Sequence, residues 1–270
     1  MPYATGSRAF QPFFSLRYFH FGFIIIGKME SIKNLVEYYD ELHPVTLAQQ
    51  TFYETMTQQF PHPAKLLSIG CGTGALCHRL AKDAVDVTGL ETQRELLESA
   101  NLKYRSQLMA LRFFQMSTLE MARFLGKKFY NIISCINNRV IFIHDKTLMK
   151  KFFFDCKELL SDGGKVVLKL FNFEKYAGSD KITLPELSSV RVSYKGAITR
   201  QADGIYRLDS FLDKGGKTIP VYEHASVYPL TKKEIESFSK EAGFRSAQFF
   251  SGFDGLSAES GSDYILAVLN

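Results

Sequence analysis

The segment from Leu66 to Gly74 constrains the fold of this 270-residue chain more than any other segment. It reads Leu-Leu-Ser-Ile-Gly-Cys-Gly-Thr-Gly, so an apolar run leads into a loop with glycine at every second position. A helix-like segment follows at 75–82, and a second apolar run over 86–90 ends at Glu91. This carboxylate lies about 20 residues after the first glycine, which is the spacing of a nucleotide-binding βαβ unit. The sequence therefore predicts parallel strands joined by helices.

Each part of this unit suits a nucleotide chemically. Glycine lets the backbone turn sharply and approach a ligand closely, because no Cβ stands in the way. The helix that begins after the loop offers unpaired N–H groups to a polar ligand, and Glu91 can accept both hydroxyls of a ribose. The pattern indicates an adenosine-type cofactor. Since Gly70-x-Gly72-x-x-Ala75 also satisfies the looser dinucleotide fingerprint, an NAD-dependent oxidoreductase stays among the alternatives.

Short apolar strands alternate with helices as far as residue 171. Two helices are expected first, over 31–43 and 46–60, before the break Pro61-His62-Pro63. The alternating elements are strands at 65–69, 86–90, 110–115, 130–136 and 165–171 and helices at 75–82, 94–104 and 148–160. The segment Ser161-Asp162-Gly163-Gly164 is expected to form a turn. Such alternation implies a parallel sheet that helices cover on both faces.

The pattern changes after Asn172. Antiparallel strands are expected at 190–194, 205–212 and 218–228, with Asp213-Lys214-Gly215-Gly216 as a hairpin turn. Thr231-x-x-Glu234 is a capping box that opens a helix, and two strands follow at 247–251 and 263–269. The predicted fold class is α/β: a Rossmann-like seven-stranded, mostly parallel sheet with helices on both faces, plus a small antiparallel β insert over 173–228.

The glycine loop and the end of the chain resemble those of one enzyme family. Gly-Cys-Gly-Thr-Gly over 70–74 is similar to motif I of class I S-adenosylmethionine (SAM) methyltransferases, and Ala242-Gly243-Phe244 before a terminal strand resembles the ending of that family. The resemblance implies one methyltransferase domain over 29–270 that converts SAM to S-adenosylhomocysteine (SAH). The insert at 173–228 resembles the substrate lid of small-molecule N-methyltransferases. The implied reaction is methyl transfer to nitrogen or oxygen of a small molecule.

The resemblance also implies a set of site residues. The cofactor-binding residues would be Gly70, Cys71, Gly72, Gly74, Glu91, Ser117, Thr118, Asn137 and Tyr39. The chain departs from the family pattern at two positions. Ser117 stands where an aspartate often bonds the adenine, and Ser68, which precedes the loop, replaces an acidic residue. The expected substrate-binding residues are Asn138 and Tyr222.

No catalytic residue can be assigned from the sequence. A sulfonium methyl is already activated, so positioning and exclusion of water supply most of the acceleration. A general base is needed only if the acceptor carries a proton on the attacking atom. The candidates for such a base are His144 and His224.

Charge and composition leave two alternatives open. The net charge of +5 favours an anionic partner such as RNA, but Ser134-Cys135-Ile136-Asn137-Asn138 at the fourth strand end lacks the Asn/Asp-Pro-Pro-aromatic motif of base methylation. Ser68 and Ser117 suggest a non-catalytic SAM-binding protein as the other alternative. The preferred partner is a small molecule, and the chain is expected to be a monomer or a homodimer.

The four cysteines and the first 28 residues complete the prediction. No Cys-x-x-Cys pair occurs, so we expect reduced thiols in a cytoplasmic protein without a metal site. Residues 1–28 are rich in aromatic side chains, and their apolar run 21–26 is too short for a membrane span, which needs about 20 residues. Three interpretations compete: translation upstream of a true start at Met29, a disordered or loosely docked extension, and an interfacial anchor.

Overall fold

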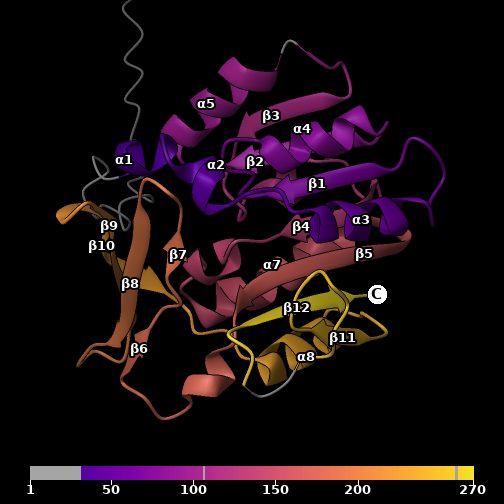
Figure 1. Ribbon diagram of the computed structural model, residues 1–270. Coiled ribbons are helices and arrows are strands. Elements are labelled where there is room, and N and C mark those ends of the chain that lie inside the picture. The colour runs from indigo at the N-terminus through magenta and orange to yellow at the C-terminus, as the bar shows by residue number, and fades with distance from the viewer. Residues whose placement is uncertain (1–31, 106, 259–260) are drawn as a thin grey trace, which may run out of the picture.

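A seven-stranded sheet forms the centre of the protein in the computed structural model, which describes residues 32–105, 107–258 and 261–270 (Figure 1). The strand order is β11-β12-β5-β4-β1-β2-β3. Neighbouring strands are parallel except that β12 is antiparallel to both β5 and β11. The bounds are β1 Lys65–Ile69, β2 Asp86–Glu91, β3 Leu111–Gln115, β4 Tyr130–Cys135, β5 Leu160–Phe171, β11 Ala247–Phe250 and β12 Tyr264–Leu269. The predicted fold class is therefore confirmed.

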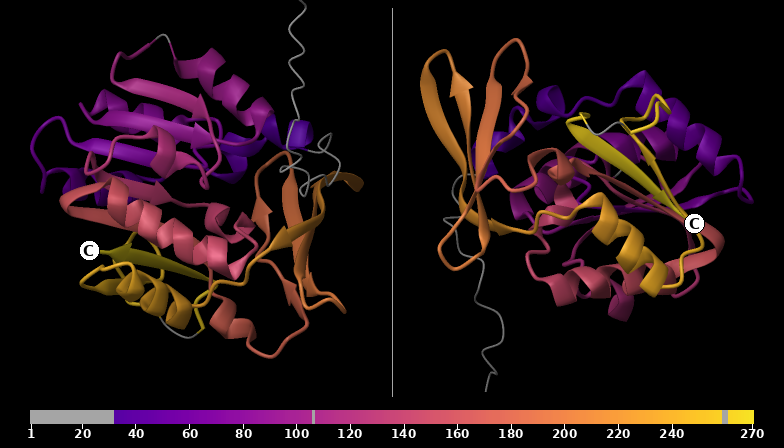
Figure 2. Two further views of the ribbon diagram at one scale, coloured as in Figure 1. Left: turned by 180° about the vertical axis from the view of Figure 1, so that it is seen from behind. Right: turned by 90° about the horizontal axis from the view of Figure 1, so that it is seen from below.

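Helices cover both faces of this sheet (Figure 2). One face packs against α3 (Leu47–Thr57), α4 (Ala75–Lys82) and α5 (Arg94–Tyr104), and the other against α6 (Met121–Phe124), α7 (Lys146–Leu159) and α8 (Lys232–Glu241). The apolar face of α7 places Phe152 and Phe153 at full burial against the strands. The expected capping box starts α8, because Thr231 and Glu234 bond reciprocally to each other's backbone N–H.

The parallel register brings the functional loops together. Ser68 of β1 pairs with Gly89 of β2 and with Ser134 of β4, so these strands end at the same edge of the sheet. The loops that leave β1, β2 and β4 therefore meet at that edge, which is where ligands bind in open α/β sheets. A short 3-10 helix, η1 (Arg139–Phe142), follows the end of β4 there.

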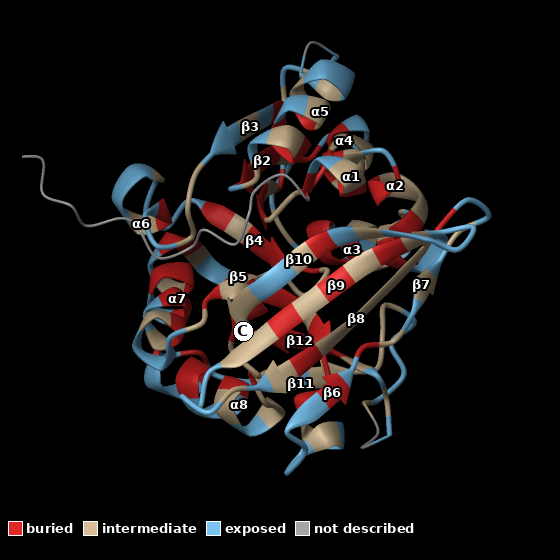
Figure 3. Ribbon diagram, turned by 90° about the vertical axis from the view of Figure 1, so that its left-hand side faces the viewer, coloured by how far each residue is buried: buried red, intermediate tan, exposed pale blue. Residues whose placement is uncertain are grey.

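A second, antiparallel sheet stands beside this edge (Figure 3). Its path is β10-β9-β8-β6, and β7 pairs with β8. Its elements are β6 Lys181–Thr183, β7 Leu187–Ser188, β8 Ser193–Arg200, β9 Tyr206–Lys214 and β10 Lys217–Val227, preceded by the 3-10 helix η2, Phe173–Tyr176. Buried residues of this sheet and of the loop before β8, namely Leu212, Val221 and Val192, pack against α1 (Ile32–Val36) and α2 (Tyr39–Leu42). The insert and the N-terminal helices thus enclose one end of the main sheet.

Several element predictions are wrong in detail. The expected helix 31–43 is two short helices, α1 and α2, and the expected turn at 161–164 lies within β5, where Gly163 adopts φ +73°. The expected strand 190–194 is largely a loop, and the real strand is β8, which begins at Ser193. Only Ile198 is fully buried in β8, so this strand carries little apolar alternation for a sequence pattern to detect. The strands β6 and β7 and the helix α6 were not predicted.

The N-terminal prediction for 1–28 lies outside the described residues. Among the helices that the structure does describe, none combines the length and the apolar character that a membrane crossing requires.

Candidate functional site

The glycine loop after β1 presents bare backbone to its surroundings. Gly70 and Gly72 have φ angles of +67° and +59°, a conformation that side chains rarely tolerate. A Cβ at Gly70 would lie 2.6 Å from Cγ of Arg139, and one at Gly72 would lie 2.5 Å from the hydroxyl of Tyr39. Both glycines are therefore required by the close approach of these two side chains.

Glu91 anchors the same loop at the end of β2. Its residue exposure is only 1%, and its Oε2 accepts a hydrogen bond of 2.9 Å from the backbone N–H of Gly72. Its Oε1 accepts bonds from the backbone N–H groups of Thr92 and Gln93 at 2.9 and 3.0 Å. These bonds fix the orientation of the carboxylate. The residue expected to hold a ribose is thus a buried, preorganised acceptor.

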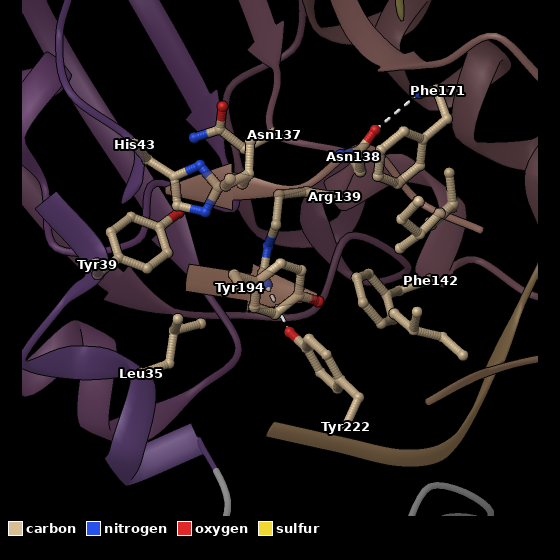
Figure 4. A pocket seen from close by; sticks show the side chains of 14 residues that line it. Leu35, Tyr39, His43, Asn137, Asn138, Arg139, Phe142, Phe171, Tyr194 and Tyr222 are labelled. Carbon is tan, nitrogen blue, oxygen red and sulfur yellow. Dashed lines mark hydrogen bonds between the residues drawn. The ribbon is translucent and has the colours of Figure 1, made fainter. Parts of the chain in front are cut away.

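Arg139 pairs with this carboxylate. Its Nη2 lies 2.5 Å from Oε1 of Glu91, and its Nη1 donates to the hydroxyl of Tyr222 at 3.3 Å (Figure 4). Only 11% of the Arg139 side chain is exposed. The guanidinium therefore connects the cofactor end of the site, at β2, with β10 of the insert. Sequence analysis did not predict this role, because the contact joins residues far apart in the chain.

The turn after β4 holds Arg139 in place. Asn137 and Asn138 both adopt positive φ angles, +54° and +61°, which asparagine tolerates better than most residues. The Asn138 side chain accepts a bond of 2.7 Å from the backbone N–H of Phe171 at the end of β5. The backbone N–H of Asn138 donates a hydrogen bond to the backbone carbonyl of Lys169 at 3.1 Å. Two consecutive left-handed residues tied to β5 give a fixed turn, and such strained positions are frequent at functional sites.

Two adjoining cavities, of about 220 and about 50 Å³, lie between the main sheet, α2 and the insert. The larger cavity also borders Ser68, Gly70 and Cys71, and the smaller one borders Tyr194 and Tyr222 of the insert. Residues that line both are Tyr39, His43, Asn137, Asn138 and Leu187. The shared lining makes them two chambers of one site, with the glycine loop at one end and the insert at the other.

The larger chamber is smaller than the ~300–1,000 Å³ that small-molecule pockets typically occupy. Tyr39 and Arg139 account for this, since both side chains lie against the glycine loop. The Tyr39 hydroxyl is buried, and burial raises the pKa of Tyr39 well above its usual range. Tyr39 is therefore neutral at physiological pH and can move without leaving a charge behind.

His43 is a site residue that sequence analysis missed. It forms the C-cap of α2, lines both chambers and lies 4.7 Å from the Tyr39 ring, centroid to centroid. Burial, with the positive charges of Arg139 and Lys169 as smaller causes, lowers the pKa of His43 to about 4. The imidazole is thus neutral at pH 7 and can accept a hydrogen bond. The sequence feature that could have identified His43 is its position directly after the helix that begins at Tyr39.

The structure places the predicted bases elsewhere. His144 follows η1 and lines neither chamber. His224 has a side chain that is 75% exposed, and its Nδ1 lies 3.2 Å from Asp209. His224 occupies an irregularity in the β9–β10 pairing with φ +54°, which turns its side chain outward. Neither histidine is therefore brought to the chambers.

The remaining predicted residues separate into two groups. The predicted residues that line the chambers are Tyr39, Gly70, Cys71, Asn137, Asn138 and Tyr222. Those that line neither chamber are Gly72, Gly74, Glu91, Ser117 and Thr118, of which the last two follow β3. Ser117 accepts a local bond from the N–H of Leu119 instead. The adenine contact assigned to Ser117 and Thr118 stays a prediction.

The cysteine at the loop is not an activated nucleophile. Cys71 lies beside Cys77, and hydrogen bonding with Cys77 together with burial raises the pKa of the Cys71 thiol. All four cysteines are unpaired. Within 32–105, 107–258 and 261–270, no group of three or more His, Cys, Asp or Glu side chains is placed to hold a metal ion.

The sequence matches a known domain family over this site. Residues 66–164, from β1 to β5, match the model of a family described as a methyltransferase domain. A protein of Geobacillus sp. (strain WCH70), provisionally named a methyltransferase, is 25% identical over 130 residues, which are 47% of this chain and 51% of that protein. The chain spans about half the length of the curated relatives it matches, 51% and 43% for the first two.

Solved structures extend the likeness over the whole fold. The CcbJ methyltransferase from Streptomyces caelestis has a TM-score of 0.68 at 16% identity, with 87% of this chain and 95% of that chain covered. The sugar N-methyltransferase KedS8 from Streptoalloteichus sp ATCC 53650 has a TM-score of 0.61 at 13% identity and covers 99% of both chains. At these identities the likeness concerns the fold, and in KedS8 it includes the region of the insert.

Proposed function

We propose that this chain, a class I SAM-dependent methyltransferase by its fold and its methyltransferase domain, transfers a methyl group from SAM to a nitrogen or oxygen atom of a small molecule. The family resemblance and the cofactor expected from the sequence are both confirmed by that domain match and fold. The single observation that carries the proposal is the arrangement of Glu91 and the glycine loop. A buried, backbone-bonded carboxylate lies beside the glycine loop at the carboxyl edge of a parallel sheet, where Gly70 and Cys71 line the larger chamber.

The residues of this edge fit the cofactor. Glu91 has the charge and the acceptor capacity to bind ribose hydroxyls. Arg139 and Tyr39 lie against the backbone of Gly70 and Gly72, so a cofactor can contact this backbone once these two side chains move. Asn137, at the end of β4, lines both chambers between the loop and the insert. When bound, SAM supplies a methyl group that its sulfonium already activates. The chain itself has to bind the two substrates, orient them and exclude water.

The smaller chamber is the proposed acceptor site. Tyr194 and Tyr222 of the insert and Phe142 of η1 line it together with Asn138. An aromatic wall with few polar groups suits a small organic molecule that is held in a fixed orientation. We propose that the insert, 173–228, acts as the lid of this site. The sugar N-methyltransferase activity of KedS8, which carries a comparable fold, favours a nitrogen acceptor.

His43 is proposed to orient the methyl acceptor by accepting a hydrogen bond from its attacking amine or hydroxyl. The imidazole borders both chambers and is neutral at pH 7, because its pKa is about 4. The same low pKa makes it too weak a base to keep the proton that the acceptor loses, so this proton passes to solvent. This assignment replaces the proposed roles of His144 and His224, which lie outside the chambers.

A non-catalytic protein that binds SAM or SAH weakly is the second candidate, and the position of Arg139 is consistent with weak binding. Arg139 forms an ion pair with Glu91, and its side chain lies against Gly70. The site is therefore closed to a cofactor in the conformation described. RNA methylation receives less support, since the chambers are enclosed by the insert and are small compared with a nucleotide in a polymer.

Isothermal calorimetry against SAM, SAH and NADH tests the proposal. We expect micromolar binding of SAM and SAH and none of NADH. Glu91→Gln should weaken SAH binding by roughly 1–3 kcal/mol, because a charged acceptor of the ribose hydroxyls is lost. The matched control is Glu98→Gln, which removes an exposed carboxylate paired with Arg94 on α5 and should leave SAH affinity unchanged.

Two results would contradict the assignment. Binding of NADH in place of SAM would indicate the oxidoreductase alternative. Equal SAH affinity in wild type and Glu91→Gln would remove the ribose role of Glu91. If SAM binds, release of SAH in the presence of a panel of small amines and alcohols separates the enzyme from a non-catalytic binder.

A further inference from the structure

Lys169 is a cation in the larger chamber that none of the roles above uses. It lies near the end of β5, where its carbonyl accepts the N–H of Asn138 at 3.1 Å and its register partner on β12 is Leu266. Its ammonium lies 5.2 Å from the ring centroids of both Phe253 and Tyr264. The side chain therefore belongs to the chamber wall beside the β4 turn, between the cofactor loop and the acceptor site.

The ammonium has no carboxylate partner among the residues that the structure describes. No ion pair or side-chain hydrogen bond links Lys169 to that part of the chain, and its contacts are the two aromatic rings. The acid that lines the same chamber, Asp40, is already occupied, because it pairs with Lys103 at 2.7 Å and accepts from the hydroxyl of Thr73. Neither Asp40 nor Glu91 is therefore available to Lys169.

The surroundings of Lys169 favour the arrival of a negative charge. Burial lowers the pKa of Lys169, since the partly desolvated ammonium lacks a counter-ion. The charges of Lys169 and Arg139 also act together on His43, which they bias toward its neutral form. Contacts with aromatic rings stabilise a cation only partly, by about 0.5–2 kcal/mol. The sulfonium of SAM would add a further positive charge to this environment, so an anion beside Lys169 has to come from a carboxylate or phosphate of one of the two substrates.

We propose that Lys169 binds an anionic group, a carboxylate or a phosphate, of the methyl acceptor, and hence that the acceptor is an anion. The inference rests on the proposed function and extends the acceptor from the smaller chamber into the adjoining part of the larger one, which Lys169 lines. Lys169 would hold the acceptor next to Asn138 and His43, with its attacking atom directed toward the cofactor loop. Pairing of the Lys169 ammonium with this anionic group would make the site prefer anionic acceptors to neutral analogues of the same shape.

The first experiment measures anion binding directly and does not require knowledge of the acceptor. The thermal unfolding midpoint of the full chain is recorded with acetate and, separately, with inorganic phosphate, against chloride at the same ionic strength, with and without SAH. We expect a rise of about 2–4 °C in wild type at saturating anion and no rise in Lys169→Met. Lys165→Met is the matched control on the same strand, since Lys165 bonds to Gln59 and lies outside the chambers, and it should retain the rise.

An equal rise in wild type and Lys169→Met, or no rise in wild type with either anion, would overturn the proposal. A rise with acetate alone indicates a carboxylate acceptor, and a rise with phosphate alone indicates a phosphorylated one. Either result supports an anion site at Lys169.

The second experiment identifies the source of the anion, because SAM itself carries a carboxylate. We expect the SAH dissociation constants of wild type and Lys169→Met to agree within about twofold. A tenfold loss of SAH affinity would show that Lys169 holds the cofactor carboxylate and would overturn the assignment to the acceptor. Failure of SAH to bind wild type would count against the proposed function, and the anion shift of the free protein would still report on Lys169.

Discussion

At the scale of single residues, Glu91 has one carboxylate and two groups that compete for it. Arg139 lies 2.5 Å from Oε1 of Glu91 in the structure, and the proposed function requires ribose hydroxyls at the same carboxylate. The Arg139 side chain also lies against Gly70, where the cofactor has to pass. Arg139 must therefore leave Glu91 before the carboxylate can serve the ribose, and the closed conformation reduces the apparent affinity for the cofactor.

Arg139→Met should consequently bind SAH more tightly, by about tenfold, because no internal partner has to be displaced from Glu91. The same variant should be less stable without ligand, by about 3–5 kcal/mol, since removal of one partner leaves a buried charge uncompensated. Calorimetry with SAH and urea unfolding measure the two effects. Arg112→Met is the control, because Arg112 pairs with Asp86 at a partly exposed position. Weaker SAH binding by Arg139→Met would mean that Arg139 contacts the cofactor itself.

Sequence patterns reveal some of these residues and conceal others for a physical reason. Gly70, Gly72 and Glu91 were predicted because one βαβ unit dictates their spacing along the chain. Arg139 and Lys169 were not predicted, since their importance comes from neighbours on other strands and on the insert. A lysine within an apolar strand is ordinary as a sequence feature, and only the structure shows that its ammonium lacks a carboxylate.

At the scale of elements, α2 joins the glycine loop to the insert. Tyr39, the first residue of α2, lies against Gly72, and the C-cap His43 lines both chambers. Packing of this short helix depends on Leu42 and on the buried residues of β9 and β10, because a helix of one turn is not stable alone. Sequence analysis foresaw a helix here but not its break from α1, since Tyr38 and its neighbours fit one continuous amphipathic pattern.

The buried His43 makes the docking of α2 dependent on pH. Its folded pKa is about 4 and its usual value is 6.5, because burial, Arg139 and Lys169 oppose the charged form while Asp40 favours it. Above pH 6.5 both folded and unfolded chains hold a neutral imidazole, and the full stability is present. As the pH falls from 6.5 toward 4, only the unfolded chain takes up the proton, so the free energy of unfolding decreases by on the order of 3 kcal/mol. Below pH 4 this contribution has been lost.

Urea unfolding at pH 7.5 and pH 4.5 measures this loss. The difference in the free energy of unfolding between the two pH values should be smaller in His43→Gln than in wild type, because the substituted side chain does not titrate. Other groups, such as carboxylates, contribute equally to both proteins and cancel. His62→Gln, at an exposed position, should retain the wild-type difference. An unchanged difference in His43→Gln would show that His43 is not buried as described.

At the scale of the whole molecule, the two sheets share their hydrophobic packing. One cluster of buried residues includes Leu168 and Leu170 of β5 together with Ile198 and Leu208 of the insert. The insert contacts α1 and α2 through a further cluster around Leu212. An insert that packed only through polar contacts would behave as a separate domain. Sequence analysis predicted the position of the insert at 173–228, but the shared packing depends on which faces meet, and no periodicity encodes that.

This shared packing predicts that the main sheet and the insert unfold in one cooperative transition. The chain contains no tryptophan, so single reporters can be introduced without background. Phe211→Trp places one on β9 of the insert, and Phe249→Trp places one on β11 of the main sheet, both at partly buried positions. The two urea unfolding curves, followed by fluorescence, should have the same midpoint and slope.

Addition of SAH should shift both midpoints upward by the same amount. SAH binds only the folded state, so it stabilises both sheets if they unfold in one transition. A lower midpoint for Phe211→Trp alone, with circular dichroism showing equal overall stability of the two variants, would mean that the insert opens independently and that the chambers can admit their ligands by local unfolding.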